Sequence, residues 1–311
     1  GMHGAYACNM AVSECDLLFS IGTRFNDRIT GKLHSFAPKA QIIHIDIDTA
    51  AISKNVTVDV PLVGDAKEAI ALMLSIAENE EPCKVDEWLS RMNEWHEQKP
   101  LVMEEKEKLV PKQVIDAINE YFDEPIVTTD VGQNQMWTTQ FLQLYGRRQM
   151  LTSGGLGTMG YGLGAAIGAQ IGNPDKQVIN IAGDGCFRMN MNEIATAARE
   201  KLPLIEVIVN NHVLGMVRQW QDLFYEKRYS ATVLDDGVDF VKLAEAMGAK
   251  GYRVTSQEEF KEAFKEALES EVPVLIDCII NCDDKVWPMV APGEAISSSF
   301  TGEDLAKKQQ S

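Results

Sequence analysis

The chain has 311 residues, of which 45% are hydrophobic and 24% are charged. This balance is typical of a globular protein of about two domains, and it excludes collagen-like, disordered and disulfide-scaffold proteins. The formal net charge of −17 repels phosphate backbones and anionic bilayers. We therefore expect no nucleic-acid partner and no membrane partner.

The six cysteines are scattered and form no C-x-x-C pair, which is typical of reduced cysteines in a cytoplasmic protein. No apolar run reaches the ~18 residues that a membrane span requires. The first residues show no secretory signal pattern. The sequence therefore predicts a cytoplasmic location.

Residues 1–76 alternate strand and helix patterns. The apolar runs at residues 17–21, 41–47 and 57–63 predict strands, and residues 66–76 predict a helix. Strands that alternate with helices are typical of a parallel α/β layer. Because this segment contains only three strand candidates, we expect part of a doubly wound domain.

A charged segment, residues 77–107, follows and predicts a linker with a surface helix over residues 85–95. A second α/β pattern over residues 108–287 predicts a complete parallel-sheet domain. Residues 288–311 carry Gly, Ser and charge, and we expect a mobile or frayed tail there. The elements expected in the second domain are helix 111–121, strand 126–129, helix 135–144, strand 177–182, helix 191–201, strand 204–209, helices 239–247 and 257–270, and strand 274–280.

A glycine pattern at Gly155, Gly157 and Gly160 matches the dinucleotide fingerprint G-x-G-x-x-G. The fingerprint requires a strand directly before it, and residues 147–153 are a poor strand candidate. Close packing of a helix over residues 160–169 explains Gly160, Gly164 and Gly168 equally well, because a spacing of four puts them on one helix face. A nicotinamide-dependent dehydrogenase is therefore only a minor alternative.

Two polar motifs follow two predicted strands of the second domain. The Gly-Asp-Gly motif centred on Asp184 follows strand 177–182, and the Asn-Asn pair ending in Asn211 follows strand 204–209. A helix between the strands predicts a parallel pair that ends at one sheet edge, where open α/β sheets bind ligands. Carboxylate and amide oxygens suit Mg²⁺ or Ca²⁺ but not zinc or copper, and Mg²⁺ usually bridges a phosphate group. The pair of motifs indicates a Mg²⁺–diphosphate site, although each alone is also an ordinary turn former.

The same motifs resemble the signature of thiamine-diphosphate enzymes, in which Gly-Asp-Gly is followed after 24 residues by Asn-Asn. Four further segments are similar to the catalytic large subunit of the acetolactate synthase (acetohydroxyacid synthase) family. They are GMHG at residues 1–4, QNQMW at 133–137, TSGGLGTMG at 152–160 and GMVRQWQ at 215–221. The resemblance covers essentially the whole chain.

The resemblance implies an α/β fold in which a partial central domain precedes a complete thiamine-diphosphate-binding domain. It implies an enzyme that decarboxylates pyruvate on thiamine diphosphate and condenses the product with pyruvate or 2-ketobutyrate, in branched-chain amino acid biosynthesis. The expected substrates are therefore 2-keto acids. A homodimer or homotetramer is the expected assembly, and a regulatory small subunit is a further candidate partner.

The resemblance also implies roles for individual residues in the second domain. The Mg²⁺ ligands would be Asp184, Asn211 and the carbonyl of Val213. Met159 would lie beneath the cofactor and hold it bent. The residues around thiamine diphosphate would be Val131, Gly132, Gln133, Asn134, Gly157, Met159, Gly185 and Cys186.

Two further groups of residues follow from the resemblance. Met216, Val217 and Trp220 would line the acceptor side of the substrate site. The front segment would bind FAD, which is not a redox partner in this family's reaction. The FAD positions would be Met2, His3, Gly4, Gly22, Thr23, Arg24, Asp46 and Asp65.

Some features depart from the family pattern. Asn134 stands where a histidine is common, so its phosphate contact is expected to be weaker. The glutamate that activates the cofactor belongs to an N-terminal domain that would lie before residue 1, so we expect no catalytic residue here and no activity of the isolated chain. The alternatives are a sister enzyme of the pyruvate oxidase or glyoxylate carboligase type, or a non-catalytic diphosphate-binding module.

Overall fold

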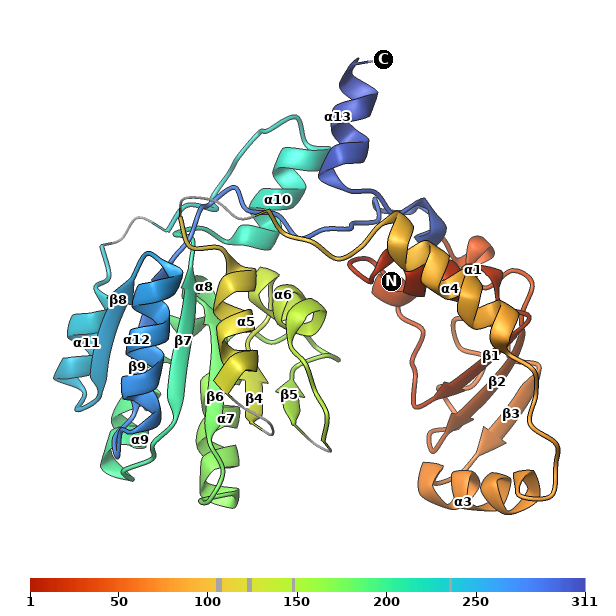
Figure 1. The fold of residues 1–311 in the computed structure, drawn as a ribbon, viewed down its shortest axis with the longest axis horizontal. Helices are drawn as coiled ribbons and strands as arrows, with labels where there is room; N and C mark the ends of the chain where they lie inside the picture. The colour runs from red at the N-terminus through yellow and green to blue at the C-terminus, as the bar shows by residue number, and fades with distance from the viewer. Residues whose placement is uncertain (105–107, 122–124, 147–148, 235–236, 311) are drawn as a thin grey trace. The chain divides into compact units, whose positions relative to one another are not determined.

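The computed structural model describes residues 1–104, 108–121, 125–146, 149–234 and 237–310. The chain forms two compact units, which are Gly1–Val102 together with Trp287–Ser311, and Met103–Val286 (Figure 1). Each unit contains its own parallel sheet, with three strands in the first and six in the second. The α/β class predicted from the sequence is confirmed.

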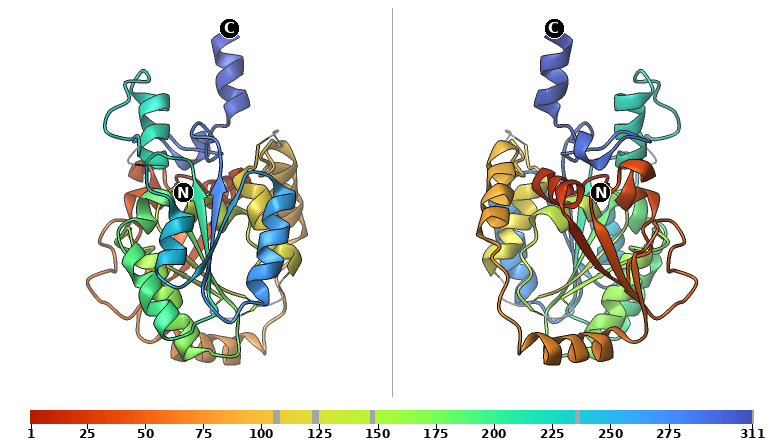
Figure 2. Two further views of the ribbon diagram at one scale, coloured as in Figure 1. Left: turned by 90° about the vertical axis from the view of Figure 1, so that its left-hand side faces the viewer. Right: turned by 90° about the vertical axis from the view of Figure 1, so that its right-hand side faces the viewer.

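The second unit is built on a six-stranded sheet of order β5-β4-β6-β7-β9-β8, in which every neighbouring pair is parallel. The central strands are buried along almost their whole length because helices cover both faces of the sheet (Figure 2). The strands are β4 (Ile126–Thr129), β5 (Met150–Thr152), β6 (Val178–Gly183), β7 (Ile205–Asn210), β8 (Lys250–Val254) and β9 (Val274–Ile279).

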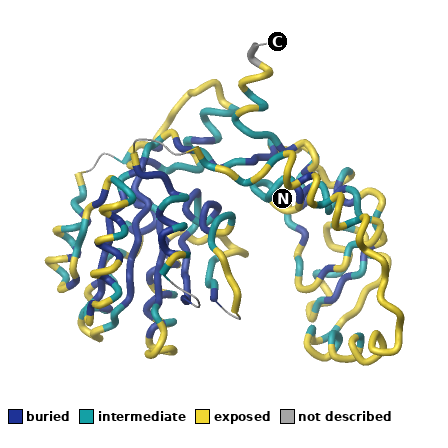
Figure 3. The backbone as a smooth tube through the Cα atoms, viewed as in Figure 1, coloured by how far each residue is buried: buried dark blue, intermediate teal, exposed yellow. Residues whose placement is uncertain are grey.

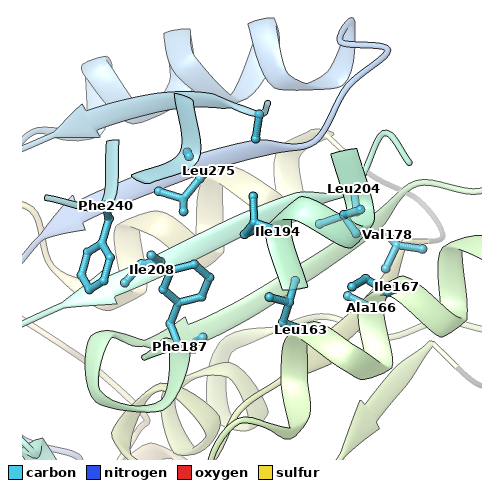
Figure 4. Packing of buried hydrophobic residues seen from close by; sticks show 14 of the residues in the cluster. Leu163, Ala166, Ile167, Val178, Phe187, Ile194, Leu204, Ile208, Phe240 and Leu275 are labelled. Atoms are coloured by element: carbon cyan, nitrogen blue, oxygen red, sulfur yellow. The ribbon is translucent and has the colours of Figure 1, made fainter. Parts of the chain in front are cut away.

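Helices on one face of this sheet bury a continuous apolar core (Figures 3 and 4). Phe187 and Phe240 meet edge to face there, with ring centroids 5.4 Å apart. Burial of each such side chain stabilises the fold by about 1.5–3 kcal/mol. The helical segments of the unit are α5 (Pro111–Tyr121), α6 (Gln133–Phe141), α7 (Tyr161–Gly172), α8 (Asp184–Phe187), a 3₁₀ turn (Met191–Glu193), α9 (Ile194–Arg199), α10 (Gly215–Phe224), α11 (Phe240–Ala246) and α12 (Gln257–Leu268).

The edge strands of this sheet differ from the sequence prediction. Residues 150–152, within the segment judged a poor strand, form β5 beside β4, while residues 147–148 lie outside the described residues. β8 was not predicted because its exposed Lys250 and Arg253 break the apolar pattern. The predicted helix at 191–201 is shorter, since it begins as a 3₁₀ turn and Lys201 has φ of +52°.

The first unit contains the three parallel strands predicted from the sequence, in the order β1-β2-β3. Phe25, Phe36, Ile42 and Ile296 form its core on one face. Alternate residues of β1, beginning with Leu17, are exposed on the other face, as expected for a partial doubly wound domain. The elements are α1 (Tyr6–Glu14), β1 (Leu17–Ile21), α2 (Asp27–Thr30), a 3₁₀ turn (Leu33–Ser35), β2 (Gln41–Asp46), β3 (Val60–Val63), α3 (Ala66–Ala77), α4 (Asp86–Gln98), a 3₁₀ turn (Ile296–Ser298) and α13 (Gly302–Gln310).

The segments expected as linker and tail take part in the first unit. Helix α4 packs against α1, and the Lys99 Nζ atom lies 2.8 Å from the Asp304 carboxylate. The expected frayed tail instead contributes Ile296 to the core and forms helix α13. Within the described part of the chain, no helix is both long and apolar enough to cross a bilayer.

A buried polar ladder crosses the centre of the larger sheet. The Thr128 hydroxyl donates to Asn180 Oδ1 over 2.8 Å, and Asn180 Nδ2 lies 2.9 Å from each oxygen of Glu206. Burial raises the pKa of Glu206 well above its usual value, against the lowering effect of Asn180. The folded protein therefore holds a proton on Glu206 at a pH where the unfolded chain does not.

This linkage predicts a pH-dependent effect of Glu206→Gln. The stability that protonated Glu206 provides is complete below its ordinary pKa and is lost as pH rises through its raised folded pKa. The variant should therefore match the native chain near pH 5 and exceed it by about 1 kcal/mol or more near pH 9. Urea denaturation at both pH values measures this difference. Glu262→Gln, on an exposed face of α12, should change neither value, and a pH-independent effect of Glu206→Gln contradicts the account.

Candidate functional site

Three polar side chains follow three neighbouring strands of the larger sheet. Asp130 follows β4, Asp184 follows β6 and Asn211 follows β7. Because these strands are parallel neighbours, their carboxyl ends meet at one edge. Asp184 is 1% exposed and Asn211 is 6% exposed. The structure thus brings Asp184 and Asn211 to the same edge, as the sequence predicts.

Asp184 has an incompletely satisfied carboxylate. Among the described residues, its Oδ2 atom is buried and has no hydrogen-bond partner. Burial raises the pKa of Asp184 to about 7, against the lowering effects of Arg188 and of nearby backbone N–H groups. Buried polar atoms without a partner are rare in native proteins. A cation at this position would satisfy the oxygen and keep the carboxylate ionised.

Asn211 can supply a second oxygen. Its Oδ1 accepts a hydrogen bond from the Val213 N–H over 3.1 Å, and an amide oxygen has room for a further partner. The described residues contain no cluster of three or more His, Cys, Asp or Glu that could hold a metal. Mg²⁺ usually binds only one or two protein side chains, and phosphate and water oxygens complete its coordination. The residues present therefore fit Mg²⁺.

The loop that carries Val213 is held from two sides. The Leu214 N–H donates to the Thr232 carbonyl over 2.7 Å, and the Leu234 N–H donates to the His212 carbonyl over 2.8 Å. His212 has a left-handed φ of +58°. These bonds fix the course of the backbone at Val213, whose carbonyl is the third cation ligand expected from the sequence.

The start of helix α6 offers backbone donors next to this edge. Gly132 precedes it with φ of +124°, and the first N–H bonded back to Gly132 is that of Met136. The N–H groups of the first turn therefore point out of the helix, where anions bind. Cys186 joins this segment to α8, since its Sγ donates to the Val131 carbonyl over 2.9 Å. Burial raises the pKa of the Cys186 thiol to about 12, so the thiol stays neutral.

The side chains of Gln133 and Asn134 are occupied within the protein. Asn134 Nδ2 donates to the Asp130 carbonyl over 2.9 Å and to the Ile181 carbonyl over 3.0 Å, and so ties β4 to β6. Gln133 bonds through both of its side-chain polar atoms to other parts of the unit. Any contact of these two residues with a diphosphate would therefore use their backbone N–H groups.

Asp130 is a site residue that the sequence did not identify. Its carboxylate accepts hydrogen bonds from the N–H groups of Gly160 over 2.8 Å and Gly162 over 3.1 Å. It thereby fixes the glycine-rich turn that carries Met159. Its position directly after a predicted strand is the signal that could have revealed it, as it did for Asp184.

The glycine-rich turn also places two of the expected cofactor residues. Gly157 has φ of +66°, and Gly160 has φ of +87° and leaves no room for a Cβ, which would lie 2.7 Å from Met189 Cβ. Close packing thus accounts for the glycine at position 160. Met159 is partly exposed, and its Cε lies 3.8 Å from the position of a Cβ on Gly185. Met159 and the Gly-Asp-Gly motif therefore border the same space.

Helix α10 directly follows the loop that carries Val213, and it contains the residues expected on the acceptor side. Trp220 packs edge to face on Phe224, with ring centroids 5.6 Å apart. Val217 is 50% exposed, and Met216 is partly exposed. Met216 and Trp220 are four residues apart and therefore lie on the same face of α10, which begins four residues after Asn211.

The positions expected for FAD are grouped at one edge of the smaller sheet. Gly22 and Asp65 follow β1 and β3, and Asp46 ends β2. Gly22 has φ of +64°, with open space around its Cα. Arg24 is exposed, and no carboxylate of the described residues pairs with it. Asp65 has a structural role as well, because it caps α3 through the Lys67 and Glu68 N–H groups.

The N-terminal residues expected at FAD lie near the loop that follows β1. The Met2 N–H donates to the Arg28 carbonyl over 2.7 Å, and the Met2 carbonyl accepts from the Val290 N–H over 2.9 Å. Burial lowers the pKa of His3 to about 4, so its imidazole is neutral near pH 7. Met2, His3 and Gly4 therefore share the first unit with Thr23 and Arg24.

Two protein-family models match the chain. The model for the thiamine pyrophosphate enzyme, central domain, matches residues 1–73. The model for the thiamine pyrophosphate enzyme, C-terminal TPP binding domain, matches residues 130–278. The chain belongs to the thiamine pyrophosphate enzyme family.

Curated relatives narrow the similarity within that family. The acetolactate synthase large subunit of Porphyra purpurea is 44% identical over 95% of this chain and 51% of its own length. That of Corynebacterium glutamicum is 45% identical over 96% of this chain and 49% of its own length. The probable acetolactate synthase large subunit of Methanocaldococcus jannaschii is 45% identical over 96% and 52%. The chain is thus homologous to acetolactate synthase large subunits and spans about half the length of these relatives.

The raised pKa of Asp184, whose Oδ2 atom has no hydrogen-bond partner, predicts how Asp184→Asn changes stability. Without a cation, the buried charge should destabilise the native chain as pH rises through about 7, because the folded-state pKa is raised to that value. Asp184→Asn removes the charge, so at pH near 8 it should be more stable by on the order of 3 kcal/mol. Added Mg²⁺ should then raise the midpoint of the native chain and leave that of the variant unchanged.

Thermal denaturation at several pH values, with EDTA or with Mg²⁺, measures both effects. Asp175→Asn is the matched control, since Asp175 is exposed and precedes β6, whereas Asp184 follows the opposite end of that strand. Equal stabilisation of native chain and Asp184→Asn by Mg²⁺ would contradict the assignment of Asp184 as a ligand.

Proposed function

We propose that this chain forms the thiamine-diphosphate-, Mg²⁺- and acceptor-binding part of an acetolactate synthase. The observation that carries the proposal is the buried, unpartnered Asp184 oxygen at the sheet edge that Asn211 also reaches. The identity of 43–45% to acetolactate synthase large subunits supports the choice of reaction. The reaction would be decarboxylation of pyruvate and transfer of its two-carbon unit to pyruvate or 2-ketobutyrate.

In this proposal the protein holds the cation with oxygens only. Asp184, Asn211 and the carbonyl of Val213 would hold Mg²⁺, which would supply positive charge for binding the diphosphate. When bound, thiamine diphosphate supplies the carbon nucleophile and the electron sink for decarboxylation of a 2-keto acid. Because Asp184 would otherwise bury an unpaired charge, the cation and the protein stabilise each other.

In this proposal the other contacts with the cofactor come mainly from backbone groups. The N–H groups at the start of α6, after Gly132, would donate to the diphosphate, and the segment from Gly185 to Cys186 would contact it. Gly157 and Met159 would contact the other end of the cofactor, and the Met159 side chain would support it. Asp130 supports this arrangement, because it holds the turn after Met159 in place.

The acceptor would lie against helix α10. Met216, Val217 and Trp220 offer apolar surface that can contact the alkyl group of the second 2-keto acid. The exposure of Val217 and the packing of Trp220 on Phe224 support a preformed wall. An apolar wall discriminates between a methyl and an ethyl group by about 1–3 kcal/mol.

The first unit would bind FAD as a structural dinucleotide. The unpaired Arg24 can meet a phosphate, and the open backbone at Gly22 leaves room for one to approach. We also propose that the protein acts in the cytoplasm as a homodimer or homotetramer. The homology to large subunits supports a small regulatory subunit as a further partner.

Calorimetric titration of thiamine diphosphate tests the central proposal. Binding should require Mg²⁺, because the diphosphate and Asp184 would otherwise repel each other. EDTA should abolish binding, and Asp184→Asn should weaken it by about 10-fold or more. Binding that is equally strong in EDTA, or binding of NADH in its place, would contradict the proposal.

The proposed contact between Trp220 and the acceptor predicts the effect of Trp220→Leu in the assembled synthase that contains this chain. Removing the indole takes apolar contact from the larger acceptor, so preference for 2-ketobutyrate over pyruvate should fall about 10-fold. Competition between the two acceptors, with quantification of both products, measures the ratio. Trp88→Leu, in α4 of the first unit, should leave it unchanged. An unaltered preference for 2-ketobutyrate over pyruvate in Trp220→Leu would contradict the proposal that Trp220 contacts the acceptor.

A further inference from the structure

Three buried amide side chains form one continuous hydrogen-bonded chain beside the cation site. Gln219 Nε2 donates to the Val286 carbonyl over 3.0 Å, and Gln219 Oε1 accepts from the Val286 N–H over 2.9 Å. Gln133 Nε2 donates to Gln219 Oε1 over 2.8 Å. Asn211 Nδ2 then donates to Gln133 Oε1 over 3.1 Å. The three side chains are 5%, 2% and 6% exposed for Gln133, Gln219 and Asn211.

The direction of every bond in this amide chain follows from its backbone end. The Val286 N–H can only donate and its carbonyl can only accept, so together they determine which end of the Gln219 amide is oxygen. The oxygen of Gln219 then requires the nitrogen of Gln133, which the Asp284 carbonyl also accepts over 3.0 Å. The oxygen of Gln133 is left to face Asn211, and it requires the nitrogen of Asn211.

The consequence is the orientation of the Asn211 amide. With its nitrogen on Gln133, its oxygen faces the Val213 N–H and the loop assigned to the cation. A flipped Asn211 would set oxygen against oxygen at Gln133 and N–H against N–H at Val213. An amide nitrogen cannot bind a hard cation, so the wrong orientation would remove a ligand.

We propose that Gln133 and Gln219 are positioning residues that hold Asn211 with its oxygen toward Mg²⁺. The inference rests on the proposed function, since it assumes that Asn211 is a cation ligand. It gives Gln133 a role different from a side-chain contact with the diphosphate. It also gives helix α10, through Gln219, a direct link to the cation site.

Gly215 provides a second observation in favour of this role. A Cβ at Gly215 would overlap Gln133 Oε1 and would lie 2.6 Å from Asn211 Nδ2. Helix α10 therefore begins with a glycine at the position where a larger residue would disrupt the hydrogen bond between Asn211 and Gln133. Gly215→Ala should break that link, because the added Cβ would displace both Gln133 Oε1 and Asn211 Nδ2.

Gln133→Met, Gln219→Met and the double variant test the proposal. Mg²⁺ affinity is measured by calorimetry in the presence of thiamine diphosphate, and stability is measured by urea denaturation. Each single variant should weaken Mg²⁺ binding about 10-fold, within the range seen when groups that orient a metal ligand are removed. The double variant should lose no more than about 10-fold as well, because a chain broken twice orients Asn211 no worse than a chain broken once.

Gln170→Met is the matched control. Gln170 is also a buried glutamine, and it bonds to the Asn173 and Lys176 carbonyls far from the site in the same unit. It should lose stability and keep Mg²⁺ affinity. Gly215→Ala should reproduce the loss seen in Gln133→Met.

The outcomes separate this inference from the proposed function. Unchanged Mg²⁺ affinity in both single variants, with a native chain that binds Mg²⁺, overturns the inference alone. Losses that multiply in the double variant also overturn it, because they indicate two independent contributions. A native chain that binds no Mg²⁺ with thiamine diphosphate overturns both the proposed function and this inference.

Discussion

The burial of one Asp184 oxygen without a protein partner is the constraint on which the rest of the site depends. Burial of the Asp184 carboxylate, directly after β6, disfavours its ionised form and raises its pKa to about 7. A hard cation removes this penalty, while the neighbouring strand ends supply further oxygens. The donor set, the backbone N–H groups at α6 and the glycine turns then all favour one kind of ligand, a diphosphate bound through Mg²⁺.

Much of the polar structure around this edge serves to hold a few atoms in place. Asp130 fixes the glycine-rich turn through Gly160 and Gly162. Asn134 joins the ends of β4 and β6. Asn210 donates to Asp277, which pairs with Arg253 at the far side of the sheet. These contacts make the strand ends a rigid platform, which a site for an anionic cofactor requires.

The sequence predicted the central strands well, because a strand buried on both faces is a largely apolar run, which single residues such as Asn180 and Glu206 interrupt. Strand β4 was predicted at its observed bounds, and the edge strand β8 was missed because its exposed side chains are polar. Asp184 and Asn211 could be predicted from their places after two strands. Asp130 holds the same kind of position after β4 but was not identified. The amide chain could not be predicted, since Gln133 and Gln219 are 86 residues apart and meet only in the fold.

The most direct test of the account is the position of the cation itself. A crystal structure of the chain with Mn²⁺ and thiamine diphosphate, with anomalous scattering from the metal, would locate it. The account predicts one metal within about 2.0–2.2 Å of an Asp184 oxygen and of Asn211 Oδ1, with a phosphate oxygen completing the group. A metal bound elsewhere, or Asn211 turned so that its nitrogen faces the ion, would contradict it.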